Sequence, residues 1–133
     1  MIGLVVATHG TLGEALLATA AMIVGPQEQA CALSLSRESS PEELHARLAG
    51  AIARFETDGG GVLVMADMFG GTPANIGMTL LDPGRVELLA GVNLPMLLKF
   101  FSQRQRYPLT ELVWRLKEQS RDSIVLGGDV LEH

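Results

Sequence analysis

Short apolar runs alternate along the chain with longer segments whose apolar residues recur every three or four positions. The apolar runs are partly β-branched and predict buried strands at residues 2–7, 30–35, 62–66 and 86–90. The periodic segments predict helices at residues 11–24, 40–56, 95–103 and 109–119, and one more that begins at Thr72. Residues 123–126 form a further apolar run, which predicts a short last strand.

Several helix starts are marked by side chains that accept hydrogen bonds from free backbone amides. Thr11 with Glu14, and Ser40 with Glu43, have the spacing of a capping box at the first two helices. Thr72 is expected to cap the third helix, because a proline follows it at the first helical position. These signals separate the helices from the loops that precede them.

Strands that are apolar throughout and separated by helices are typical of a parallel sheet covered on both faces. We therefore expect an α/β fold with a doubly wound, mostly parallel sheet. Four strands in such a fold commonly take the order 2-1-3-4, and ligands bind outside the carboxyl ends of strands 1 and 3. His9 and Asp67 stand at these two ends, so the fold brings an imidazole and a carboxylate to one crevice.

His9 alone is explained equally well as a hydrogen-bonded loop histidine or as a functional group. Asp67 makes a functional role for His9 the better explanation. A carboxylate that accepts a hydrogen bond from one ring nitrogen fixes the tautomer of the imidazole and leaves the lone pair of the other nitrogen free. The pair therefore indicates a nucleophilic histidine as the catalytic group. The alternative role of Asp67 is to cap the turn that follows the third strand.

The residues after this aspartate, Phe-Gly-Gly-Thr-Pro-Ala-Asn at 69–75, end in a predicted helix start. Glycines let backbone amides approach a ligand closely, and a helix N-terminus beside a histidine binds anions such as phosphate. By itself this sequence is better explained as a tight turn, but its position beside the histidine and the carboxylate favours phosphate. The residues expected to bind phosphate are Gly10, Gly70, Gly71 and Thr72.

Composition excludes several classes of protein. The chain has 133 residues, 47% hydrophobic and 19% charged, which predicts one folded domain rather than a disordered chain. The net charge of −5 argues against nucleic acid and anionic membranes as partners. No apolar run is long enough to span a bilayer, and the N-terminus lacks the basic region of a signal peptide. Cys31 is the only cysteine, so a cytoplasmic protein without an internal disulfide is expected.

Other catalytic and cofactor sites are poorly matched. The chain lacks the glycine pattern of dinucleotide-binding folds, the lysine of a phosphate-binding P-loop and the GxSxG motif of hydrolases. Histidine and cysteine are too few for a metal site, so neither cofactor nor metal is expected. Leu-Glu-His at residues 131–133 has the sequence of a vector-encoded purification tag, and the single domain is assigned to residues 1–130.

Three motifs in register resemble the mannose-family enzyme IIA component of the bacterial phosphoenolpyruvate:sugar phosphotransferase system (PTS). The motifs are Thr-His-Gly at residues 8–10, Asp-Met-Phe-Gly-Gly-Thr-Pro-Ala-Asn at 67–75 and Ala-Gly-Val-Asn-Leu-Pro-Met-Leu at 90–97. The resemblance extends over nearly the whole chain. It implies the doubly wound fold and a cytoplasmic phosphotransferase in which His9 is phosphorylated, Asp67 is the active-site aspartate and Thr72 supplies a phosphate-contacting hydroxyl.

The resemblance also implies partners. The phosphoryl group is expected to come from the histidine of the phosphocarrier HPr and to pass to an enzyme IIB component. Known dimers of the family exchange a C-terminal strand, which residues 123–126 would supply in a homodimer. Three alternatives remain: a regulatory sensor in an incomplete phosphotransferase system, the phosphocarrier subunit of a dihydroxyacetone kinase, and a small-molecule binding domain with a structural histidine.

Met68 departs from the family pattern, since sugar-transporting members often have threonine there. Without that hydroxyl, Thr72 and backbone amides must hold the phosphate. Met68, Phe69 and Met96 are candidates for an apolar contact patch for the partners, with core packing as the alternative. Asn93 is expected either to cap the helix that follows it or to order the loop after the third strand.

Overall fold

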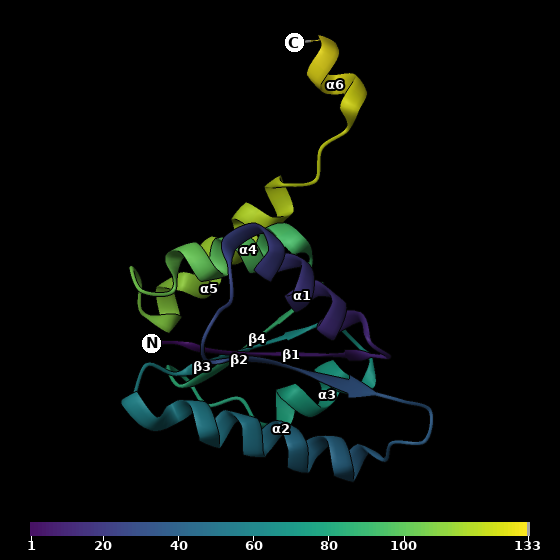
Figure 1. The fold of residues 1–133 in the computed structure, drawn as a ribbon, viewed down its shortest axis with the longest axis vertical. Coiled ribbons are helices and arrows are strands. Elements are labelled where there is room, and N and C mark those ends of the chain that lie inside the picture. Colours follow the sequence, from purple (N-terminus) through teal and green to yellow (C-terminus); the bar gives the residue numbers. More distant parts are fainter. Residues whose placement is uncertain (133) are drawn as a thin grey trace.

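Four parallel strands form a central sheet in the order β2-β1-β3-β4 (Figure 1). In this computed structural model, which describes residues 1–132, the strands are β1 (Gly3–His9), β2 (Ala30–Leu35), β3 (Val62–Ala66) and β4 (Val86–Ala90). The predicted α/β class and strand order are confirmed. Because β1 pairs with β2 on one side and β3 on the other, the switch point lies between β1 and β3.

Helices cover both faces of the sheet (Figure 1). One face carries α1 (Leu12–Val24), α4 (Leu94–Gln103) and α5 (Leu109–Asp122), and the other carries α2 (Pro41–Phe55) and α3 (Thr72–Thr79). A short 3-10 helix, η1 (Glu56–Asp58), follows α2. No helix in residues 1–132 combines the length and the apolar character needed to cross a membrane.

The strands are apolar throughout because each face of the sheet packs against helices. In β1, Leu4 and Val6 belong to the core shared with α4 and α5, whereas Val5 and Ala7 belong to the core shared with α2. All four side chains are fully buried. A polar residue at any of these positions would lose its water without gaining a partner, which explains why the only polar side chains of β1 lie at its carboxyl end.

The first two helix starts differ in how they are capped. The Ser40 hydroxyl accepts a hydrogen bond from the Glu43 N–H at 3.1 Å, as predicted. The prediction for Thr11 was wrong, because its backbone (φ −96°, ψ 14°) is not extended and its side chain makes no capping hydrogen bond. The hydroxyl of Thr8 accepts from the Gly13 N–H instead, at 2.8 Å.

The segment after α5 leads away from the body of the molecule (Figure 1). Residues 123–126 form no strand, because within residues 1–132 they have no neighbouring strand to pair with. They lead into a short helix, α6 (Gly127–Glu132), which was not predicted. Exchange of this segment between two chains stays a prediction. His133, assigned to the tag remnant, lies outside the described residues, and that assignment also stays a prediction.

Candidate functional site

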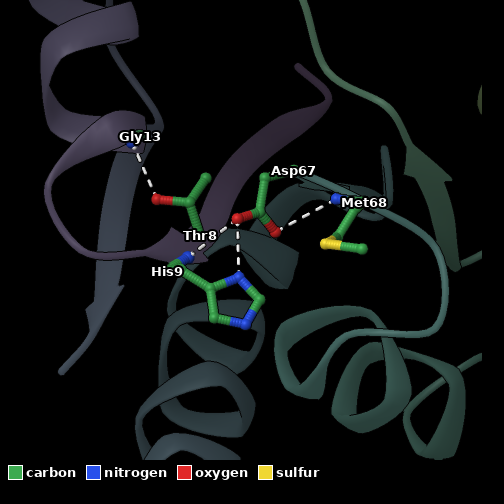
Figure 2. A network of polar contacts seen from close by, with 5 residues as sticks. All are labelled: Thr8, His9, Gly13, Asp67 and Met68. Carbon is green, nitrogen blue, oxygen red and sulfur yellow. Dashed lines mark hydrogen bonds and ion pairs between the residues drawn. The ribbon is translucent and has the colours of Figure 1, made fainter. Parts of the chain in front are cut away.

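His9 and Asp67 meet at the carboxyl ends of β1 and β3 (Figure 2). The ring Nδ1 of His9 lies 2.7 Å from the Oδ2 atom of Asp67. The same oxygen accepts a hydrogen bond from the backbone N–H of His9 at 3.0 Å. Because a carboxylate only accepts, the hydrogen of the ring is held on Nδ1 and the lone pair of Nε2 is left free. The expected juxtaposition of these two residues is therefore confirmed.

The two side chains differ in exposure. The His9 side chain is 49% exposed and that of Asp67 is 13% exposed. Burial acts to raise the pKa of the Asp67 carboxyl, but hydrogen bonds from the His9 ring and backbone N–H outweigh it, so the pKa is lowered. The other oxygen, Oδ1, accepts from the Met68 N–H at 3.1 Å, so Asp67 also caps the turn after β3. A shielded, ionised carboxylate thus orients an accessible imidazole.

The loop before α3 packs against the edge of the His9 ring. A methyl group added at Gly71 would lie 2.9 Å from Cε1 of the ring and 3.6 Å from Nε2. The backbone of Gly71 (φ −84°, ψ 165°) suits any residue, so proximity to the ring is what requires glycine there. Gly70 is different, because its φ of +90° lies in the left-handed region.

Gly71 is the cap residue of α3, and the prediction that Thr72 holds this position was wrong. The extended backbone of Gly71 starts the helix one residue earlier, and its carbonyl accepts from the Asn75 N–H at 2.9 Å. No side chain caps this helix. The N–H groups of Thr72 and Ala74 have no acceptor within the helix, so the N-terminus of α3 can bind an anion.

Gly10 occupies the turn between β1 and α1 with a φ of +54°. Its N–H donates to the carbonyl oxygen of Leu35 in β2 at 2.8 Å. A phosphate contact through this amide would require that hydrogen bond to break. The geometry shows Gly10 as the turn residue that follows the strand, and its expected contact with phosphate stays a prediction.

The turn after β4 holds the end of β3 in place. The N–H groups of Gly91 and Val92 both donate to the carbonyl oxygen of Ala66, at 3.0 and 3.1 Å. Asn93 caps α4 through its Oδ1 atom, which accepts from the Met96 N–H at 2.9 Å. The capping role predicted for Asn93 is confirmed, and the ordering of the neighbouring loop comes from the two backbone amides.

Exposed apolar side chains lie at the starts of the segments that form the site. Met68 and Phe69 are exposed, the latter by 71%, whereas Met96 is only 4% exposed and packs in the core. Sequence reasoning missed Leu12, the first residue of α1, which is about half exposed. We call Leu12, Met68 and Phe69 the apolar collar.

Comparison with known proteins identifies relatives across almost the whole chain. The EIIA-man family model, described as PTS system fructose IIA component, matches residues 3–117. The PTS system fructose-specific EIIA component of Bacillus subtilis is 30% identical over 133 residues, covering 99% of this chain and 90% of that protein. The PTS system mannose-specific EIIAB component of Escherichia coli K12 is 34% identical over 125 residues, covering 92% of this chain. The chain spans 38% of the length of that protein.

Solved structures agree with the sequence comparison. The crystal structure of phosphotransferase system component EIIA from Streptococcus agalactiae superposes with a TM-score of 0.88 at 25% identity. The match covers 97% of this chain and 99% of that one, so the two share the whole fold. The family match, the Bacillus subtilis relative and the shared fold together confirm the resemblance, and this chain belongs to the EIIA-man family of PTS IIA components.

Proposed function

We propose that this chain carries a phosphoryl group on Nε2 of His9, taking it from the phosphohistidine of HPr and passing it to an enzyme IIB component. The observation that carries the proposal is the 2.7 Å pair of His9 Nδ1 and Asp67 Oδ2, which leaves Nε2 free beside the uncapped N-terminus of α3. The relatives, named as mannose-specific and fructose-specific PTS components, support a role in a sugar phosphotransferase system. We place this role in the cytoplasm as part of the proposal.

Phosphoryl transfer at this site needs a nucleophile and a way to hold the charge that develops. The lone pair of His9 Nε2 forms the new bond to phosphorus while the bond to the donor nitrogen breaks and its electron pair returns to the donor. The imidazolium that results keeps its hydrogen on Nδ1, and the negative charge of Asp67 stabilises it. Passing the group to the next protein reverses these steps.

The N-terminus of α3 supplies the phosphate-binding groups. The transition state is loose and in line, so catalysis depends on positioning and on donors aimed at the equatorial oxygens. The free amides of Thr72 and Ala74, together with the Thr72 hydroxyl, are the donors we assign to this role. At Gly70, an added methyl group would meet no atom within 4 Å, whereas Gly71 packs against the His9 ring and brings the helix N-terminus next to it. Because Met68 has no hydroxyl, backbone amides must supply more of the hydrogen bonds to the phosphate than in family members with threonine at this position.

The apolar collar supports the inference that donor and acceptor are proteins. Exposed apolar residues around a polar site are typical of a surface that docks protein partners. The half-exposed His9 ring is accessible for transfer to a group that another protein presents. A phosphoryl carrier must bind its donor and its acceptor one after the other. One docking surface around His9 could bind both partners in turn.

The test is phosphorylation in a reconstituted system. Incubation with phosphoenolpyruvate, enzyme I and HPr is expected to add one phosphate that is labile in acid and stable in base, as is typical of phosphohistidine. Subsequent addition of a cognate enzyme IIB component is expected to remove the label. Absence of labelling with active enzyme I and HPr would contradict the proposal, and a base-labile label would move it from histidine to a carboxyl group.

Replacing Gly71 by alanine is expected to slow transfer about tenfold while the fold is retained. The added methyl group would meet Cε1 of His9 at 2.9 Å, so the ring must turn away from Asp67. The measurement is the rate of phosphorylation by phospho-HPr. The matched control is Gly50→Ala in α2, where an added methyl group meets no atom within 4 Å, and which is expected to transfer at the wild-type rate. Equal rates for the two variants would contradict the steric argument.

The C-terminal segment supports the proposed homodimer. Among the strands, β4 pairs only with β3, and on its other side an isolated antiparallel bridge joins Val86 to Asp82. Beyond that bridge, no strand within residues 1–132 covers this edge of β4. Two hollows of about 190 and 260 Å³ lie along β4 and α5 and share Lys117 in their lining. Trp114 lines the first, and Ile124 lines the second. Residues 124–126 are exposed and apolar, so the same segment of a second copy is suited to pair with β4 and cover this groove.

Replacing Val125 by aspartate is expected to convert a dimer into a monomer, because a charge would be buried between the two chains. Light scattering at micromolar concentration measures the mass. Fluorescence of Trp114, the only tryptophan, is expected to shift to longer wavelength as the groove is uncovered. Met22→Asp, on the exposed surface of α1, is the control and is expected to stay dimeric. A monomeric wild-type protein would contradict the exchange.

A further inference from the structure

Thr8, the residue before His9, is fully buried at the end of β1 (Figure 2). Its hydroxyl oxygen accepts a hydrogen bond from the Gly13 N–H in the first turn of α1, at 2.8 Å. This bond closes a short loop that contains His9 and the left-handed turn at Gly10. Thr8 thus caps α1 from inside the preceding strand, in place of Thr11.

At Gly13, α1 lies so close to β1 that an added side-chain carbon would be crowded. A methyl group added at Gly13 would lie 3.0 Å from the Val6 carbonyl oxygen and 3.3 Å from the Thr8 hydroxyl oxygen. Glycine at this position therefore permits the hydrogen bond to Thr8. The start of the helix, and with it the chain that leaves His9, is held at a set distance from β1.

Three hydrogen bonds tie the backbone around His9 to three different segments of the chain. The His9 N–H donates to Asp67 after β3, and the Gly10 N–H donates to Leu35 in β2. The Thr8 hydroxyl makes the third contact, to α1. The first two hold the end of the strand within the sheet, whereas the third sets the path of the chain after His9.

We propose that Thr8 is a positioning residue for phosphoryl transfer, acting through the backbone of His9. This inference rests on the proposed function of His9. Valine has the shape of threonine but no acceptor, so Thr8→Val would leave the buried Gly13 N–H without a partner. The first turn of α1 must then shift to reach water, and the His9 backbone shifts with it. Misplacement of a reacting group by about 1 Å is sufficient to slow transfer about 100-fold.

The test measures transfer from phospho-HPr by wild type, Thr8→Val and Thr8→Ser. Thr8→Val is expected to lower kcat by about 10- to 100-fold and to leave KM for phospho-HPr nearly unchanged, because the docking surface is intact. Thr8→Ser keeps the hydroxyl and is expected to restore most of the rate. The nitrogen NMR spectrum of the His9 ring gives a second readout, in which Thr8→Val is expected to lose the single Nδ1-protonated form.

Ser40→Ala is the matched control, because it removes a similar capping hydrogen bond from α2. It is expected to destabilise the protein without changing the rate or the His9 spectrum. A wild-type rate in Thr8→Val, or an equal loss in Ser40→Ala, would overturn the proposal. If Thr8→Val does not fold, Thr8→Cys, whose thiol is a weak acceptor, is expected to give an intermediate rate. Failure of wild type to be phosphorylated would count against the proposed function instead, and the NMR comparison would still test Thr8.

Discussion

Replacing His9 by alanine is expected to abolish phosphorylation of this chain. The methyl side chain has no lone pair, and no other imidazole in residues 1–132 has the same surroundings. His45 lies on α2 and is exposed, and within residues 1–132 it makes no hydrogen bond to a carboxylate. Labelling by phosphoenolpyruvate, enzyme I and HPr is therefore expected to fall to background, measured as bound phosphate by intact mass.

Loss of folding would give the same result, so the variant needs a structural check. The His9 side chain is about half exposed and contributes little to the core, so the thermal transition of His9→Ala is expected to stay close to that of wild type. His45→Ala is the matched control and is expected to be labelled normally. Label retained in His9→Ala, or lost in His45→Ala, would show that the phosphorylated residue has been misassigned.

The meeting of His9 and Asp67 at the candidate site could be predicted from the sequence because two simple regularities act together. Strands such as residues 62–66 have to be apolar on both faces when helices cover the sheet, so they are visible as unbroken apolar runs. Parallel order then determines which strand ends are adjacent. His9 and Asp67 meet for this reason, although 58 positions separate them in the chain.

Contacts that depend on the distance between helices and strands could not be predicted from the sequence in this way. Thr11 has the spacing of a cap, yet Thr8 makes the hydrogen bond, because α1 lies against the end of β1. Met68 and Met96 are both methionines in loops or helix starts near the candidate site. The sequence does not distinguish them, and only the packing in the structure shows that Met68 is exposed and Met96 is buried. Pattern reasoning identifies which residues can cap or pack, and tertiary geometry decides which of them do.

The C-terminal segment shows a different limit. Residues 123–126 have the apolar character of a strand, and the prediction assumed a neighbour for them. Within residues 1–132 no strand pairs with this segment, although the edge of β4 is open beyond the bridge between Asp82 and Val86. A strand is a property of a pair of segments, so its assignment here depends on a second copy of the chain.

Replacing Asp67 by asparagine is expected to slow transfer about 100-fold or more while the fold is retained, because the variant keeps the shape but not the charge. Asparagine cannot stabilise the imidazolium that forms when His9 takes the phosphoryl group. Its amide can also turn its NH₂ toward Nδ1, which moves the ring hydrogen to Nε2 and removes the nucleophile. Transfer from phospho-HPr measures the loss, and nitrogen NMR of the His9 ring reports the tautomer.

The same variant tests the charge of Asp67 through stability. Because the native pKa of Asp67 is lowered, the carboxylate stabilises the fold at pH values above its unfolded pKa of about 4. This stabilisation is lost as pH falls through the lowered native pKa. Urea unfolding is therefore expected to show Asp67→Asn less stable than wild type at neutral pH, with a smaller difference in acid.

Together the two measurements separate catalysis from structure at Asp67. The carboxylate both holds the His9 ring and caps the turn through the Met68 N–H. An asparagine carbonyl can accept the hydrogen bond from Met68, so the turn is expected to survive. A variant that is slow and well folded would assign the effect to the charge facing His9. A variant that is destabilised but transfers at the wild-type rate would show that Asp67 has only the structural role of capping the turn.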